Sequence, residues 1–170
     1  MKIFSYSKQT ISTEDIKSVT KILKSNFLTQ GPTIEKFENK IKKFVKSKYA
    51  VAVNSATSGL HLSCLSLGLK KNDYLWTVPN SFVASSNCAL YCGAKVDFVD
   101  INSKTWNIDE VLLEKKLLKT PKKKLPKILV AVHYAGEPVN LKKIYILSKK
   151  FNFKIIEDAS HALGSKFQND

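Results

Sequence analysis

Residues 127–158 read KILVAVHYAGEPVNLKKIYILSKKFNFKIIED and contain two apolar runs separated by one amphipathic segment. The runs Lys127–His133 and Lys154–Glu157 are rich in aliphatic and β-branched residues, which favour buried strands. Between them, Leu141–Phe151 has apolar residues at helical spacing and lysines on the opposite side. Because parallel strands need a crossover of about this length, the stretch predicts a strand–helix–strand unit of a parallel sheet.

The same alternation extends toward the N-terminus. Strands are predicted at Tyr49–Val53, Tyr74–Val78 and Lys95–Asp100, and helices at residues 12–25, 34–44, 60–69, 81–91 and 109–118. The pattern predicts an α/β protein with a mostly parallel sheet and helices on both faces. We expect residues 1–48 to form an N-terminal helical segment and residues 49–170 to form the domain that contains the sheet.

Composition narrows the function classes. The chain has 170 residues, of which 44% are hydrophobic, and a formal net charge of +14. All the basic residues are lysines spread along the chain, and arginine, which reads guanine edges and clamps phosphates, is absent. No apolar run approaches the roughly 18 residues of a membrane span, and the start lacks a signal-peptide apolar region. We expect a soluble, cytoplasmic protein that binds neither nucleic acid nor membrane.

The three cysteines are Cys64, Cys88 and Cys92, and none of them forms a CxxC pair. Their spacing lacks the further ligands that a zinc site requires. We therefore expect buried, reduced thiols and no metal site.

Several candidate ligand-binding residues follow the predicted strands, where parallel sheets bind their ligands. Residues 54–59 read NSATSG, and hydroxyls with free N–H groups at a helix start can bind an anion. A plain helix cap at Ser55 or Thr57 explains the same residues. Phe82 could lie over a planar ligand or belong to the core. His133 could be a base, a ring contact or a structural residue.

Asp158 follows the last predicted strand, and His161 comes three residues later. A carboxylate at the end of a central apolar strand is costly unless it meets a cation, which could be a protonated ring nitrogen, a lysine or a metal. The edge of the sheet where the strands end would thus combine an anion-binding turn, a flat apolar side chain, a carboxylate and two imidazoles. This combination suits a flat, phosphorylated heteroaromatic ligand. Pyridoxal 5′-phosphate fits, with its phosphate at the Thr57 turn, its ring against Phe82 and its ring nitrogen on Asp158.

The chain resembles a known family along nearly its whole length. The matching stretches are Leu28–Pro32 (LTQGP), Asn54–His61 (NSATSGLH), Pro79–Asn87 (PNSFVASSN), Tyr91–Asp100 (YCGAKVDFVD), His133–Leu141 (HYAGEPVNL) and Glu157–Gly164 (EDASHALG). With these motifs the sequence resembles the sugar aminotransferases of the DegT/DnrJ/StrS type, which are fold-type-I pyridoxal-phosphate enzymes.

The resemblance implies roles for six residues. Ala56, Thr57 and Ser58 match the turn that binds the cofactor phosphate. Phe82 matches the aromatic residue that stacks on the cofactor ring, and Asp158 matches the carboxylate that binds the ring nitrogen. His161 matches a residue that hydrogen-bonds near the phenolic oxygen of the ring. The last two motifs are most similar to the branch of the family that acts toward pseudaminic acid. The resemblance therefore implies amino transfer from glutamate to C4 of a UDP-4-keto-6-deoxy sugar, by a homodimer when full length.

One family residue has no match in this chain. The Schiff-base lysine of the family lies beyond the position of Asp170, and Lys166 is too close to Asp158 to take its place. The resemblance therefore implies that the chain is the N-terminal part of a longer enzyme. Residues 49–170 would be an incomplete large domain, without its later strands and without the small C-terminal domain. We expect the chain alone to be inactive in transamination.

The same resemblance predicts a strand order. In this fold two later strands separate the first strand from the fifth, so the third, second, fourth and fifth strands should form one contiguous block. The first strand should lie across a gap or rearrange. Two other functions stay open: a sugar 3-dehydratase of the same family, in which a histidine replaces the lysine, and a non-catalytic α/β module that binds a phosphorylated ligand or a partner subunit.

Overall fold

The structure is a computed structural model that describes residues 8–167, and these residues form two units with a boundary between Ala52 and Val53. The N-terminal unit contains α1 (Thr13–Leu23) and α2 (Pro32–Phe44), as the amphipathic pattern predicts. Ser12 and Asp15 form a capping box at the start of α1, which satisfies free N–H groups of the first turn. Within residues 8–167, no residue of α1 or α2 is buried, so the apolar faces of both helices are exposed.

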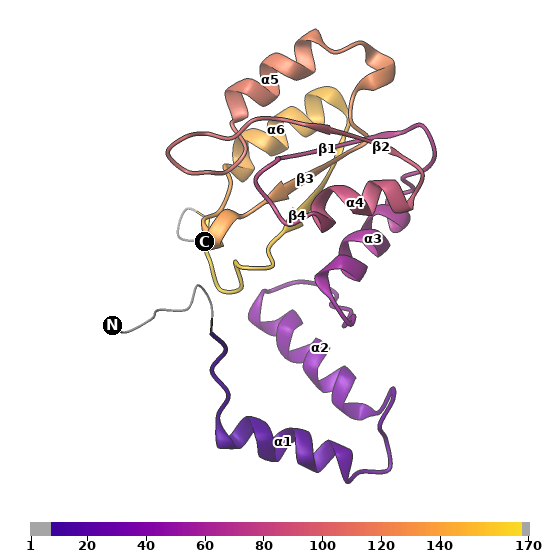
Figure 1. Ribbon diagram of the computed structural model, residues 1–170, viewed down its shortest axis with the longest axis vertical. Coiled ribbons are helices and arrows are strands. Elements are labelled where there is room, and N and C mark those ends of the chain that lie inside the picture. Colours follow the sequence, from indigo (N-terminus) through magenta and orange to yellow (C-terminus); the bar gives the residue numbers. More distant parts are fainter. Residues whose placement is uncertain (1–7, 168–170) are drawn as a thin grey trace, which may run out of the picture. The chain divides into compact units, whose positions relative to one another are not determined.

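The second unit is built on a four-stranded parallel sheet (Figure 1). Its strands are β1 (Tyr74–Thr77), β2 (Lys95–Phe98), β3 (Ile128–Val132) and β4 (Lys154–Asp158), in the order β2-β1-β3-β4. All three pairings are parallel. The order confirms the predicted contiguous block of the third, second, fourth and fifth strands.

Helices cover both faces of this sheet (Figure 1). On one side α3 (Ala56–Ser66) packs against α4 (Ala84–Tyr91), and on the other α5 (Glu110–Lys119) packs against α6 (Leu141–Phe151). Two short 3₁₀ turns, Lys122–Lys124 and Tyr134–Gly136, lie in the connections. Because helices cover the sheet on both sides, β3 is buried at every position, which explains its uninterrupted apolar sequence.

The predicted strand at Tyr49–Val53 is wrong. These residues form no strand, and Val51 is 79% exposed. A strand requires a partner for its N–H and C=O groups, and β4 has no neighbour on its outer side among residues 8–167. The apolar composition of residues 49–53 is therefore suited to a strand, but a strand forms only where a partner strand is available.

The cysteines lie where α3 meets α4. Cys64 and Cys88 are fully buried free thiols, as predicted, whereas Cys92 is partly exposed. Burial raises the pKa of the Cys92 thiol. Among the residues that the structure describes, no group of histidine, cysteine and acidic side chains has a metal-binding arrangement, and no helix is long and apolar enough to cross a membrane.

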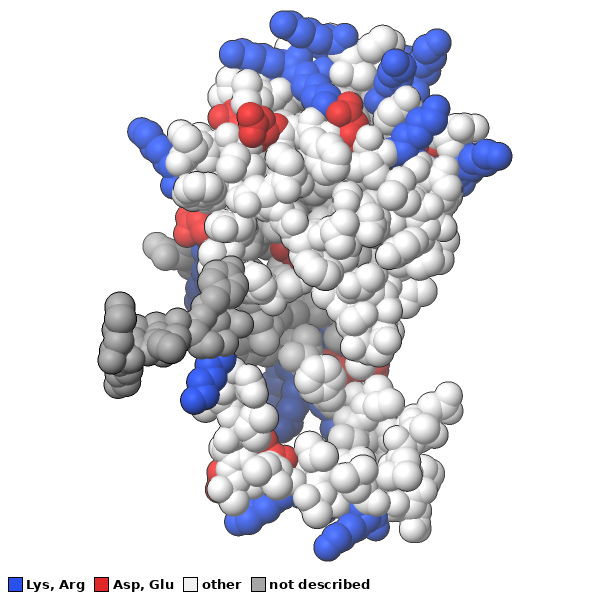
Figure 2. Space-filling view, in the orientation of Figure 1, with Lys and Arg blue, Asp and Glu red and all other residues white. Residues whose placement is uncertain are grey.

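Lysines project from the surface over α5 and α6, with carboxylates among them (Figure 2). Glu114 of α5 pairs with Lys143 of α6 at 2.6 Å, and this hydrogen bond holds the pKa of the Glu114 carboxyl below its usual value. Elsewhere in the second unit, Lys127 pairs with Asp73 at 2.8 Å and also donates to the Gly68 carbonyl oxygen. Lys127 therefore ties the chain before β3 to the chain before β1.

Neighbouring leucines of α5 provide a test of the packing. Leu117 is 1% exposed and Leu118 is 62% exposed. We expect Leu117→Ala to lower the free energy of unfolding by about 2–5 kcal/mol, because it leaves a cavity in the core. Leu118→Ala should cost less than about 1 kcal/mol. Equal losses in urea-unfolding measurements would show that the face of α5 is assigned incorrectly.

The Asp73–Lys127 pair predicts a dependence of stability on pH. Partial burial pushes the pKa of Asp73 upward, but hydrogen bonds from Lys127 and from the Lys70 N–H outweigh burial and leave this pKa lowered. A lowered pKa in the folded state stabilises the protein above the unfolded value of about 3.9, and this stability disappears as the pH falls through the folded pKa. Wild type should therefore exceed Asp73→Asn in unfolding free energy near neutral pH, and the difference should shrink in acid. A difference that stays constant down to about pH 2 would contradict this assignment.

Candidate functional site

Asp158 is the last residue of β4, and the residue is 9% exposed. Its Oδ2 accepts a hydrogen bond from Ser85 Oγ at 2.8 Å, and its Oδ1 accepts one from Ser160 Oγ at 2.6 Å. No lysine or histidine within residues 8–167 pairs with it. A buried carboxylate with hydroxyl partners but no cation carries an uncompensated charge. The position is therefore suited to bind a cationic group.

The segment before α4 lies next to this carboxylate. Ser85 belongs to the first turn of α4, so its bond to Asp158 shows that the carboxylate points to the sheet face covered by α3 and α4. Phe82 precedes the same turn and is 74% exposed. The alternative that Phe82 belongs to the core is therefore wrong. Its ring is free to cover a ligand near Asp158.

The N-terminus of α3 carries the predicted anion-binding residues. Ser55 caps the helix by accepting a hydrogen bond from the Ser58 N–H at 3.2 Å, as the cap interpretation predicted. The N–H groups of Ala56 and Thr57 have no acceptor among the described residues. These two donors, together with the helix dipole, favour an anion at this end of α3. Since α3 packs against α4 and touches β4, it lies on the same sheet face as the Asp158 side chain.

His161 lies in the loop that follows β4 and is exposed. Its side chain makes no hydrogen bond to another residue of the described chain. The loop itself is held close to the turn after β3, since Ser165 Oγ donates to the Gly136 carbonyl oxygen at 2.6 Å. A Cβ atom at Gly136, where φ is +89°, would lie 3.0 Å from the His161 carbonyl oxygen. The structure thus places His161 after Asp158 without joining the two side chains.

His133 takes the structural role that the sequence left open. Its ring is buried, and Nδ1 accepts a hydrogen bond from the Val139 N–H at 3.1 Å. Nε2 therefore carries the proton and donates to Glu157 Oε2 at 3.0 Å. Side chains alternate along a strand, so Glu157 points to the sheet face opposite Asp158. His133 holds the loop after β3, away from the carboxylate.

Comparison with known proteins agrees with this geometry. The sequence pattern of the DegT/DnrJ/EryC1/StrS aminotransferase family matches residues 9–170. The chain belongs to this family. It is 42% identical over 166 residues to the UDP-4-amino-4,6-dideoxy-N-acetyl-beta-L-altrosamine transaminase of Campylobacter jejuni, a match that covers 98% of this chain and 43% of that protein. The family expected from the motifs is confirmed.

Two solved structures confirm the predicted fold class. Helicobacter pylori PseC, an aminotransferase of pseudaminic acid biosynthesis, aligns over 99% of this chain and 44% of its own with 35% identity and a TM-score of 0.87. The PLP-form of the sugar aminotransferase Spr1654 from Streptococcus pneumoniae aligns over 95% of this chain and 44% of its own with 26% identity and a TM-score of 0.85. The chain thus spans less than half the length of the family members that it matches.

Sequence reasoning missed the serines around Asp158 and one asparagine. Ser85 and Ser160 are ordinary small residues in sequence, and only the fold brings both to the carboxylate. Asn107 is buried, accepts from the Tyr134 N–H at 2.8 Å and donates to the Glu137 carbonyl oxygen at 2.9 Å. It fastens the loop after β2 to the loop after β3. No local pattern around Asn107 indicates this role.

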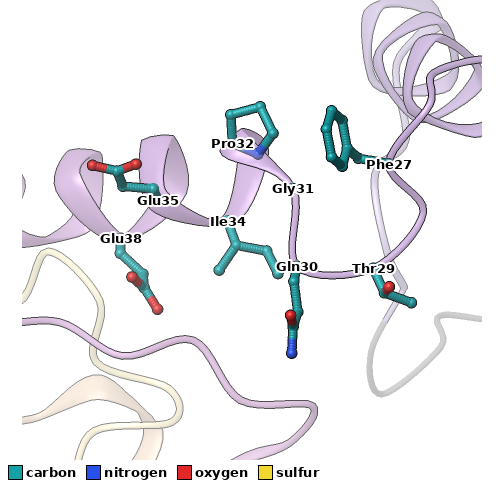
Figure 3. Close-up of a pocket in the computed structure, with 8 residues that line it drawn as sticks. All are labelled: Phe27, Thr29, Gln30, Gly31, Pro32, Ile34, Glu35 and Glu38. Atoms are coloured by element: carbon teal, nitrogen blue, oxygen red, sulfur yellow. The ribbon is translucent and has the colours of Figure 1, made fainter.

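The N-terminal unit also has a hollow, of about 570 Å³, at the family's LTQGP stretch (Figure 3). It is lined by Phe27, Thr29, Gln30, Gly31, Pro32, Ile34, Glu35 and Glu38. None of the predicted cofactor-binding residues belongs to it. The candidate site is therefore assigned to α3, α4, β4 and the segments that adjoin α4 and β4.

The structural role of His133 can be tested in this family member. We expect His133→Ala to lower the free energy of unfolding by about 1–3 kcal/mol, because the Val139 N–H would be buried without an acceptor. His161→Ala, which removes an exposed imidazole without a hydrogen bond, should change it by less than about 0.5 kcal/mol. Urea unfolding of the two variants measures the difference. Unchanged stability of His133→Ala would show that the ring does not hold the loop.

Proposed function

We propose that the protein containing this chain is a pyridoxal-phosphate-dependent nucleotide-sugar aminotransferase. It would transfer an amino group from glutamate to C4 of a UDP-4-keto-6-deoxy sugar. The observation that supports the proposal most strongly is the buried Asp158 carboxylate, which has hydroxyl partners but no cation among residues 8–167. The family membership and the similarity to the C. jejuni transaminase support the reaction class.

The residues of the site fit the cofactor at three points. Asp158 would hold the proton on the ring nitrogen, because the buried carboxylate favours a cation beside it. The free N–H groups of Ala56 and Thr57, with the Ser58 hydroxyl, would bind the phosphate at the start of α3. Phe82 would cover one face of the ring, and His161 would contact the ring near its phenolic oxygen. When bound, the cofactor supplies an electron sink for negative charge at the reacting carbon.

This chain's residues contribute binding and electrostatics. The Asp158 side chain is buried, and an interaction with a cation is stronger at a buried position than in solution. The α3 N-terminus and Asp158 would hold the two charged ends of the cofactor, which fixes how the ring lies against Phe82. Residues 1–170 would therefore bind the cofactor, whereas the Schiff-base lysine would lie outside them.

The substrate part of the proposal depends on the relatives. The C. jejuni protein is named for a UDP-linked amino-dideoxy sugar, and H. pylori PseC acts in pseudaminic acid biosynthesis. Both names support a nucleotide sugar as acceptor. From the family resemblance, the proposal also takes glutamate as donor and a cytoplasmic homodimer.

Cofactor binding and amino transfer provide the test. The protein expressed from its intact gene should bind pyridoxal phosphate, as seen in an absorbance titration, and convert glutamate and a UDP-4-keto-6-deoxy sugar to 2-oxoglutarate and the 4-amino sugar. Asp158→Asn should weaken cofactor binding by at least about tenfold, since it removes the charge beside the ring nitrogen. Glu157→Gln is the matched control, because Glu157 lies one residue away on the opposite face, and its binding should stay at the wild-type value.

Three outcomes would contradict the proposal. Absence of cofactor binding by the wild type would favour a non-catalytic module. Equal effects of Asp158→Asn and Glu157→Gln would remove Asp158 from the site. Loss of water from C3 of the sugar without amino transfer would favour a dehydratase.

A further inference from the structure

We propose that Ser85 is a positioning residue that orients the Asp158 carboxylate toward the cofactor, with Ser81 directing the Ser85 hydroxyl. The inference rests on the proposed function, since it concerns how Asp158 meets the ring nitrogen. Ser85 is 1% exposed, and its hydroxyl lies 2.8 Å from Asp158 Oδ2. Ser81 Oγ lies 2.7 Å from Ser85 Oγ.

The direction of these hydrogen bonds follows from the chemistry of the groups. An ionised carboxylate only accepts hydrogen bonds, so the Ser85 hydroxyl donates its one proton to Asp158. The Ser85 oxygen can then only accept from Ser81, so the Ser81 hydroxyl is the donor of that pair. The three groups form a chain of hydrogen bonds in which each donor reinforces the next.

The Ser85 hydroxyl has no local role in its helix. The residue preceding α4, Val83, makes no side-chain cap, and the Ser85 N–H already bonds the Phe82 carbonyl oxygen. Ser86, the next residue, uses its hydroxyl within the helix by donating to the Val83 carbonyl oxygen at 2.9 Å. Ser85 instead bonds a residue 73 positions away in sequence. The Ser85 hydroxyl therefore binds Asp158 and does not stabilise α4.

Two hydroxyls fix the plane of the carboxylate. Ser85 binds Oδ2 and Ser160 binds Oδ1, so rotation of the carboxylate would break both bonds. Oδ1 also accepts from the Ser160 N–H at 3.3 Å, so Oδ2 is the oxygen that keeps a lone pair for a further donor. Removal of Ser85 takes away the hydrogen bond that holds Oδ2, so the carboxylate can turn away from the ring nitrogen. A carboxylate in the wrong orientation would hold the ring proton less well.

Phe82 lies between Ser81 and Ser85 in the sequence. Residues 81–85 thus contain both the aromatic ring proposed to cover the cofactor and the two hydroxyls that orient Asp158. A shift of this segment would move both contacts together. The position of the ring and the orientation of Asp158 are coupled through it.

The experiment uses the protein expressed from its intact gene and loaded with pyridoxal phosphate labelled with ¹⁵N in the ring. It measures the cofactor dissociation constant and the ¹⁵N chemical shift of the ring nitrogen, which reports protonation independently of activity. For Ser85→Ala we expect binding about five- to tenfold weaker and a resonance moved toward the unprotonated form. Ser81→Ala should move both values in the same direction by a smaller amount. Ser85→Thr, which keeps a hydroxyl, should restore the resonance toward the wild-type position, and the control Ser86→Ala should leave both values unchanged.

The outcomes separate this inference from the proposed function. If the wild type does not bind the cofactor, the proposed function fails. If the wild type binds, Asp158→Asn loses affinity and Ser85→Ala keeps both wild-type values, the proposed function stands and the inference is overturned. If circular dichroism shows that Ser85→Ala is unfolded, Ser81→Ala decides, and a wild-type resonance in that folded variant overturns the inference.

Discussion

The hydrogen bond between Ser85 and Asp158 joins the end of β4 to the first turn of α4, and it links the fold of this chain to its chemistry. Asp158 is a buried anion that no cation neutralises within the described residues. Such a group costs stability, which hydroxyl partners only partly offset. Under the proposed function, a cationic group of the ligand beside the carboxylate would offset this cost.

The sheet makes this position possible. β3 is buried at all of its positions and holds β4 in parallel register, so that Val132 pairs with Asp158 at the edge where the strands end. Alternation along β4 sends Glu157 and Asp158 to opposite faces. Glu157 fastens His133 and the loop after β3, whereas Asp158 faces α4. Two adjacent carboxylates thus take different roles because the pleat separates them.

Parts of this arrangement are predictable from the sequence, and the reasons differ between elements. The apolar runs of β1, β2, β3 and β4 identify their strands because each finds a partner strand in the sheet. The run at Tyr49–Val53 has the same composition but no partner among the described residues, so its pattern is misleading. Asp158 is predictable because a charge at the end of an apolar strand is unusual. Ser85 is not, because a serine among the small residues of α4 gains its role only from a carboxylate 73 positions away.

The backbone of this chain is shared with relatives whose side chains differ from its own. H. pylori PseC and S. pneumoniae Spr1654 have TM-scores of 0.87 and 0.85 with this chain, although their identities to it are 35% and 26%. Backbone similarity therefore hardly changes while the side chains diverge. Groups that belong to the backbone, such as the N–H donors of α3, can be kept across such divergence. Differences in substrate between proteins that share this backbone must instead depend on side chains, because a nearly constant backbone cannot distinguish one substrate from another.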